Sequence, residues 1–138
     1  MQPARFESEI ECVYDSCAYF IRDQATGKEI LIFGDVEPDT VSLSPRNRKI
    51  WSEAAPKIVA ARLGGIFIEC SFDNSVTVER LYGHLAPRYL IEELKVLAEE
   101  VEIFRREGRR DDKENKKRKR ANLVLPSAGW RAPPPLSK

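Results

Sequence analysis

Three ionisable side chains stand at the ends of apolar stretches in this sequence. Asp35 follows the run Ile30–Phe33 through Gly34, Glu69 closes the run that begins at Gly65, and His84 lies just before an amphipathic stretch. An α/β protein presents ligands at the carboxyl ends of its buried strands. Ionisable groups gathered at one such edge are typical of ligand binding and proton transfer. Taken singly, each side chain has a plainer interpretation, as a solvated acidic turn, an edge ion pair or a capping histidine.

Two strands must position the first of these groups. The apolar runs Ala18–Asp23 and Ile30–Phe33 both have strand character, and the polar residues between them include Gly27. Glycine in a short polar connection supplies the positive φ that a tight turn requires. The pattern predicts a β-hairpin whose second strand delivers Asp35 into a loop.

A helix is expected after that loop. Ser44 is a suitable cap, Pro45 suits the first helical position, and apolar residues recur at helical spacing as far as Leu63. Pro56 lies inside this segment, which predicts a kink or a break. The pair Gly64 and Gly65 is expected to end the helix.

The run Gly65–Ser71 predicts a third strand. A strand, a helix and another strand in series indicate a βαβ unit with a parallel pair. In such a unit Asp35 and Glu69 emerge at the same end of the sheet. A long amphipathic helix is then expected from about Pro87 to Arg105, so that His84 precedes its amino terminus.

Composition divides the 138 residues at Phe104. Residues 1–104 carry 11 basic and 18 acidic side chains, a net charge of −7. Residues 105–138 carry 12 basic and 4 acidic side chains, a net charge of +8. The basic segment Arg105–Arg120 has no apolar residue, so it cannot build a core. We expect one domain over 1–104 and a disordered, basic and proline-rich tail over 105–138.

Cysteine usage and hydropathy exclude several classes. Cys12, Cys17 and Cys70 are odd in number and form no CxxC pair, which argues against a zinc finger or a disulfide framework. No stretch has the length and apolar character of a membrane span, and no secretory signal is apparent. A cytoplasmic protein is expected.

Five motifs in order resemble the class II cyclic nucleotide phosphodiesterases of fungi. The resemblance covers roughly residues 16–104. The motifs are Ser16-Cys17-Ala18-Tyr19-Phe20-Ile21-Arg22-Asp23, Gly34-Asp35-Val36-Glu37-Pro38-Asp39, Ile50-Trp51 with Ala54-Ala55-Pro56-Lys57, Gly65-Ile66-Phe67-Ile68-Glu69-Cys70-Ser71, and Gly83-His84-Leu85-Ala86-Pro87 with Glu92-Glu93-Leu94.

The resemblance implies a metallo-β-lactamase fold, an α/β architecture of the αββα sandwich type, of which this chain is expected to form the carboxyl-terminal half. It implies hydrolysis of a 3′,5′-cyclic nucleotide, chiefly cyclic AMP, with two divalent metal ions, zinc being favoured. Asp35 is then the aspartate that bridges the metals. Glu69 and His84 resemble the pair that assists the leaving oxygen, with His84 donating a proton.

One departure from the family pattern limits this expectation. The family's histidine-rich metal motif is expected ahead of residue 1, and His84 is the single histidine of the sequence. We therefore expect the chain alone to hold no complete metal pair and to turn over no cyclic nucleotide. The alternative is a regulatory or interaction remnant of the fold. The missing half is expected to leave an exposed sheet edge that favours self-association.

The basic cluster Lys116–Arg120 has three interpretations. It resembles a nuclear import signal, it could contact nucleic acid phosphates, or it is a solvated charge run, which we favour. No aromatic residue lies among its charges, so a stacking surface for single strands is not supported. With the solvated charge run favoured, nucleic acid is an unlikely partner.

Overall fold

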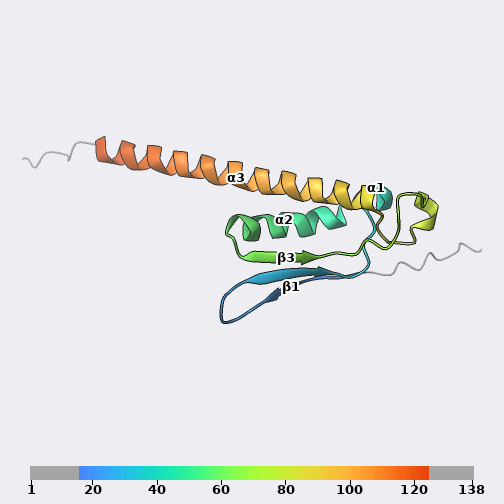
Figure 1. Cartoon of the computed structure of the whole chain (residues 1–138). Helices are drawn as coiled ribbons and strands as arrows, with labels where there is room; N and C mark the ends of the chain where they lie inside the picture. The colour runs from blue at the N-terminus through green and yellow to red at the C-terminus, as the bar shows by residue number, and fades with distance from the viewer. Residues whose placement is uncertain (1–15, 125–138) are drawn as a thin grey trace, which may run out of the picture. The chain divides into compact units, whose positions relative to one another are not determined.

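The computed structural model describes residues 16–124, which form a mixed α/β arrangement. Residues 1–15 and the proline-rich end over 125–138 lie outside these residues. The elements are β1 (Ala18–Arg22), β2 (Glu29–Phe33), α1 (Asp39–Ser42), α2 (Arg46–Val59), β3 (Leu63–Phe67), a 3₁₀ turn (Val78–Arg80) and α3 (Pro87–Val124) (Figure 1).

The sheet has three strands in the order β1-β2-β3. β1 and β2 pair antiparallel, and Gly27 between them has φ +68°, so the predicted hairpin is confirmed. β2 and β3 pair parallel, and α2 connects them, which confirms the βαβ unit. The carboxyl ends of β2 and β3 therefore face the same way, and the residues after each strand meet at one edge.

The predicted cap of α2 is wrong. The helix begins at Arg46 after Pro45, which takes the cap position, and the bond from Ser44 to the helix is made by its backbone carbonyl, which accepts from the Arg46 N–H at 2.8 Å. Instead the Asp39 carboxylate accepts hydrogen bonds from the backbone N–H groups of Asn47 and Arg48, at 2.8 and 2.9 Å. An aspartate from outside the helix thus satisfies two of its free amino-terminal donors.

The expected interruption at Pro56 does not end α2, which continues to Val59. A proline in the last turn removes a single backbone hydrogen bond. Tertiary contacts hold that turn: Lys57 Nζ lies 2.7 Å from a Glu29 oxygen, and Ile58 packs against the core.

The glycine pair does not terminate the helix either, because Gly64 and Gly65 lie within β3. Ala61 takes the left-handed conformation instead, with φ +52°. Its carbonyl accepts a 2.6 Å hydrogen bond from Lys28 Nζ, and the carbonyl of Arg62 accepts one from the Glu29 N–H. These bonds to the start of β2 fix the turn where local propensity alone would not.

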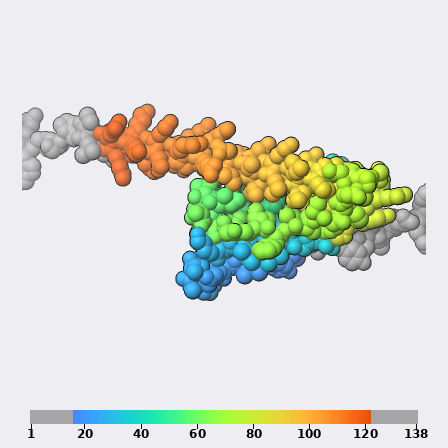
Figure 2. Space-filling model, viewed as in Figure 1, coloured from blue at the N-terminus to red at the C-terminus, as the bar shows by residue number. Residues whose placement is uncertain are grey.

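The core lies between one face of the sheet, α2 and the first turns of α3. Its buried members come from all three elements: Leu31, Trp51, Ala54, Ala55, Leu97 and Val101. Large apolar side chains of the sheet also stay exposed, including Tyr19 (60%) and Phe67 (60%). Figure 2 shows β1, in blue, at the surface of this part of the chain.

The expectation of disorder from residue 105 is wrong as far as Val124, because α3 continues to that residue. Lysine, arginine and glutamate are good helix formers, and a helix without an apolar face is supported by pairs one turn apart. Two such pairs are Arg105–Glu102 and Arg118–Glu114, at 2.9 and 2.8 Å. Residues 125–138 of the predicted tail lie outside the described part.

By its backbone contacts the chain divides into Met1–Val101 and Glu102–Lys138. The boundary predicted at 104, and the assignment of one domain and a tail, stay predictions. Among residues 16–124, no helix combines the length and apolar character needed to cross a membrane.

Candidate functional site

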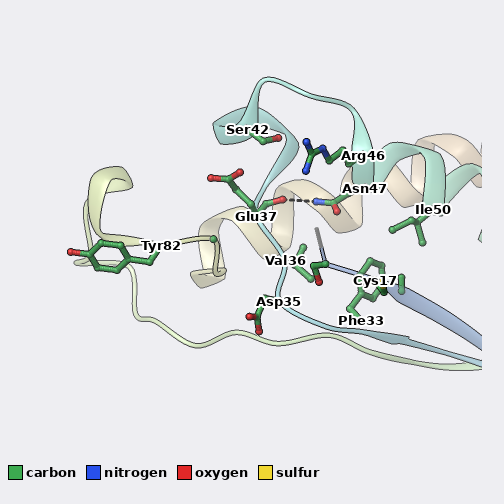
Figure 3. Close-up of a pocket in the computed structure, with 13 residues that line it drawn as sticks. Cys17, Phe33, Asp35, Val36, Glu37, Ser42, Arg46, Asn47, Ile50 and Tyr82 are labelled. Carbon is green, nitrogen blue, oxygen red and sulfur yellow. Dashed lines mark hydrogen bonds between the residues drawn. The ribbon is translucent and has the colours of Figure 1, made fainter. Parts of the chain in front are cut away.

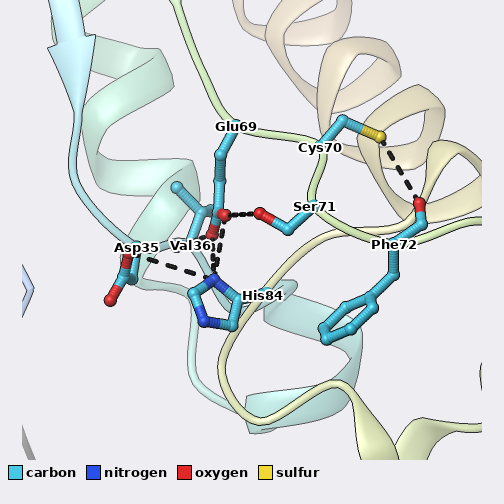
Figure 4. Close-up of polar contacts among 7 residues, drawn as sticks. All are labelled: Asp35, Val36, Glu69, Cys70, Ser71, Phe72 and His84. Atoms are coloured by element: carbon cyan, nitrogen blue, oxygen red, sulfur yellow. Dashed lines mark hydrogen bonds and ion pairs between the residues drawn. The ribbon is translucent and has the colours of Figure 1, made fainter.

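Asp35, Glu69 and His84 lie together at the edge of the sheet. Asp35 follows β2, Glu69 follows β3, and His84 precedes α3. One ligand atom from each of the three lies within 4.8 Å of the other two, so this group has the composition of a cation site (Figure 4). The structure therefore brings together all three residues singled out from the sequence.

Glu69 and His84 form the tightest contact of the group. His84 Nδ1 lies 2.8 and 2.9 Å from the two oxygens of the Glu69 carboxylate. Because an ionised carboxylate only accepts hydrogen bonds, this geometry places a ring proton on Nδ1. Nε2 is then the nitrogen left for other chemistry, and the ring is held in one orientation.

Asp35 stands beside this pair and is open to solvent. Its carboxylate oxygen lies 3.9 Å from His84 Nδ1, beyond hydrogen-bond distance, and its side chain is 77% exposed. Glu69 and His84 are more enclosed, at 19% and 30% exposure. Asp35 thus keeps its oxygens available for a ligand, whereas Glu69 is already occupied by neighbouring donors.

The surroundings of Glu69 favour its ionised form. Burial alone would raise its pKa, but hydrogen bonds from the Ser71 hydroxyl, the Val36 N–H and His84 together outweigh burial and lower the pKa. The Val36 nitrogen lies 3.0 Å from Oε1. Ser71 was not singled out from the sequence, since a hydroxyl two residues from a carboxylate carries no distinctive pattern.

Gly34 brings the Asp35 loop close to the start of β1. Its N–H donates a 2.9 Å hydrogen bond to the carbonyl of Cys17. A Cβ at this position would lie 2.8 Å from the Ser16 hydroxyl and 3.3 Å from the Cys17 carbonyl. A side chain at this position would therefore displace the Ser16 hydroxyl and press on the Cys17 carbonyl, so Gly34 eases a close approach of two segments.

Backbone hydrogen bonds hold His84 in place. Its N–H donates to the carbonyl of Leu81, and the Phe72 N–H donates to the carbonyl of Leu85. Tyr82 and Gly83 both have positive φ, at +49° and +82°, which reverses the chain just before His84. The Phe72 ring meets the imidazole edge-on, with ring centroids 6.0 Å apart.

A cavity of about 640 Å³ lies beside Asp35, which is one of its lining residues. Glu37, Arg46, Asn47 and Gly83 also line it. Figure 3 shows the Asn47 amide donating to the Glu37 carbonyl, at 2.8 Å, and the Tyr82 ring pointing away from the other labelled side chains. Neither Glu69 nor His84 lines this cavity.

Comparison with known proteins gives consistent relatives. The chain is 42% identical over 78 residues to a 3′,5′-cyclic-nucleotide phosphodiesterase of Aliivibrio fischeri, covering 56% of this chain and 24% of that protein. It is also 37% identical over 89 residues to a 3′,5′-cyclic-nucleotide phosphodiesterase of Schizosaccharomyces pombe, a match that covers 64% of this chain and 25% of that protein. The chain thus spans about a quarter of the length of the curated relatives it matches.

A solved structure agrees with the sequence relatives. The crystal structure of unliganded yeast PDE1 is 40% identical to the chain, with a TM-score of 0.53, over 61% of this chain and 23% of that one. The three-stranded sheet and its helices are therefore part of that fold, which confirms the expected partial architecture. The family model described as cAMP phosphodiesterases class-II matches residues 3–107. The chain belongs to the class II cAMP phosphodiesterase family.

Proposed function

We propose that residues 16–104 supply part of the active site of a phosphodiesterase that hydrolyses 3′,5′-cyclic AMP to the 5′-monophosphate. The observation that carries this proposal is the Glu69–His84 hydrogen bond beside the exposed carboxylate of Asp35. Acid–base chemistry needs an oriented imidazole, and phosphoryl transfer needs charge stabilisation next to it. Both components stand at one sheet edge.

In this proposal His84 is the general acid. Hydrolysis forms a bond from phosphorus to a water oxygen, which releases a proton to solvent, and breaks the bond from phosphorus to O3′. The departing O3′ takes the proton of His84 Nε2, which Glu69 aims by holding Nδ1. The lowered pKa of Glu69 keeps its carboxylate charged, so the carboxylate stays an acceptor that orients the ring through Nδ1.

The class II family is metal-dependent, and the residues at this edge fit only part of a metal pair. Asp35 offers a free carboxylate that suits a bridging position, whereas Glu69 and Nδ1 of His84 bind each other. Two zinc ions take about three or four protein ligands each, more than residues 16–124 gather here. When bound, the metals would supply a hydroxide nucleophile at neutral pH and offset phosphate charge.

The remaining ligands must come from elsewhere in a complete enzyme, so we assign the chain by itself no turnover. The incomplete ligand set also favours a second candidate function, a non-catalytic regulatory or interaction module of the same fold. A cytoplasmic location and nuclear import through Lys116–Arg120 stay predictions.

A chimera separates the two functions. Residues 16–104 would replace the matching segment of the Saccharomyces cerevisiae phosphodiesterase 1, which is 42% identical over 83 residues. Purified with zinc or manganese, a folded chimera that hydrolyses cyclic AMP supports the catalytic proposal. A chimera that folds and binds metal but gives no 5′-AMP refutes it and favours the non-catalytic module.

A further inference from the structure

Glu93 is a buried carboxylate that lies outside the group of Asp35, Glu69 and His84. The residue is 2% exposed, and it sits in the second turn of α3. One oxygen accepts a 2.8 Å hydrogen bond from the Trp51 indole N–H, and the other accepts a 2.8 Å bond from the backbone N–H of Asp39. Both of its oxygens are therefore engaged by fixed donors from two other elements.

The Asp39 bond anchors the loop that carries Asp35. Val36 donates its N–H to Glu69 at the start of this loop, and the Glu37 carbonyl accepts from the Asn47 amide in the middle. Glu93 holds the far end, where the Asp39 side chain also caps α2. The loop is thus fixed at three points, and Glu93 ties the last of them to α3.

The second oxygen ties this anchor to the core. Trp51 is fully buried, and the centroid of its ring lies 4.9 Å from the ring centroid of Phe33, the last residue of β2. Glu93 therefore connects α2 and the end of the Asp35 loop through one rigid group. Charge-assisted hydrogen bonds in a buried place resist displacement more than neutral ones.

We propose that Glu93 is a positioning residue for the Asp35 loop, acting through the Asp39 backbone rather than by touching substrate. This inference rests on the proposed function, in which Asp35 binds metal. Displacing a reacting or ligating group by about 1 Å costs up to about 100-fold in rate. Loss of the Glu93–Asp39 bond therefore reduces kcat, while substrate contacts and KM stay as they were.

Three substitutions in the chimera separate positioning from general stability. Glu93→Gln keeps the size of the side chain but replaces one carboxylate oxygen with an NH2 group. Either the Asp39 N–H or the Trp51 indole N–H then loses its acceptor. Trp51→Phe removes the indole donor and leaves the Asp39 bond in place. Glu99→Gln makes the same chemical change on an exposed position of α3 and serves as the matched control.

We expect kcat for cyclic AMP to fall about 10- to 100-fold in Glu93→Gln and less than about threefold in Trp51→Phe. KM is expected to change little in both, and Glu99→Gln should match the parent chimera. All rates are measured well below each variant's melting temperature. Equal losses of kcat in Glu93→Gln and Trp51→Phe would show a structural role only and overturn the proposal. An inactive parent chimera would refute the proposed function instead.

The 138-residue chain gives a readout that needs no activity. In ¹⁵N-labelled protein, Glu93→Gln should shift the backbone amides of Asp35, Val36 and Asp39, and Glu99→Gln should leave them unchanged. If Glu93→Gln does not fold, Glu93→Asp, which keeps both acceptors on a shorter stem, should give smaller shifts of the same amides. Unmoved Asp35 and Val36 amides in a folded Glu93 variant contradict the positioning role.

Discussion

The His84 ring is held by both oxygens of Glu69, at 2.8 and 2.9 Å from Nδ1. A ring held on this side presents Nε2 outward, where a departing oxygen could take a proton. This arrangement makes a distinct kinetic prediction, because an acid matters only when the leaving group needs a proton.

Replacing His84 with alanine in the chimera should lower kcat for cyclic AMP about 100- to 10,000-fold. The same change should cost far less with bis(p-nitrophenyl) phosphate, whose leaving group departs without protonation. Steady-state rates with both substrates test this. Equal losses on the two substrates would assign His84 a role other than proton donation.

Glu69→Gln should also lower kcat for cyclic AMP, but less than His84→Ala. The amide can still accept a hydrogen bond from Nδ1–H, whereas it carries no charge to stabilise the imidazolium form. The kcat of Glu69→Gln, compared with those of the parent and of His84→Ala under the same conditions, measures the difference. A Glu69→Gln variant with the kcat of the parent contradicts the assignment.

The depressed pKa of Glu69 also predicts a pH dependence of stability. Its pKa lies below the ordinary value of 4.5 in the folded chain. Near this pH the folded state then binds fewer protons than the unfolded state. The contribution of Glu69 to the free energy of unfolding is therefore complete above about pH 4.5 and is lost as the pH falls through the folded pKa.

Urea unfolding of the 138-residue chain between about pH 7 and pH 3 measures this contribution. Other carboxylates, such as Asp23, also have lowered pKa values, so the test is the difference between wild type and Glu69→Gln. That difference should shrink as the pH decreases toward about 3. A difference that stays constant over this range would show that Glu69 has the same pKa in both states.

The sequence predicted the parts of this site that follow from local pattern. Alternating apolar runs and Gly27 indicated the hairpin, and the strand–helix–strand order implied the shared edge where Asp35 and Glu69 meet. Bonds between residues far apart in the chain have no such pattern. Trp51 and Glu93 are 42 residues apart, and Asp39 and Glu93 are 54 apart, so neither contact could be read from periodicity.

The helix over residues 105–124 was missed for a different reason. The absence of apolar residues from Arg105–Arg120 predicts that this segment builds no core, and its residues are exposed, but that absence does not exclude a solvated helix. The spacing of Glu114 and Arg118, four residues apart with glutamate first, is the orientation that supports a helix. The charge content of a segment does not contain this spacing.

The capping role of Asp39 predicts a loss of stability. Asp39→Ala removes the acceptor for the N–H groups of Asn47 and Arg48, and should lower the free energy of unfolding by about 1 kcal/mol. Asp39→Asn, which keeps one acceptor oxygen, should cost less. Chemical denaturation of both variants measures this, with Asp111→Ala on exposed α3 as the control. Equal stability of Asp39→Ala and wild type contradicts the cap.

The isolated chain is expected to self-associate. β1 and β3 are the two edge strands among the described residues, and the sheet leaves Tyr19, Ile21 and Phe67 exposed. Unpaired strand edges next to an apolar surface favour pairing with a second chain. Sedimentation velocity should therefore show concentration-dependent species larger than the monomer.

Changing Tyr19 and Phe67 to serine should shift the distribution toward monomer. Changing the exposed Tyr82, which lies outside the sheet, to serine should not. A wild-type chain that stays monomeric at high concentration contradicts this expectation, because the open edge and apolar surface would then be insufficient to recruit another copy.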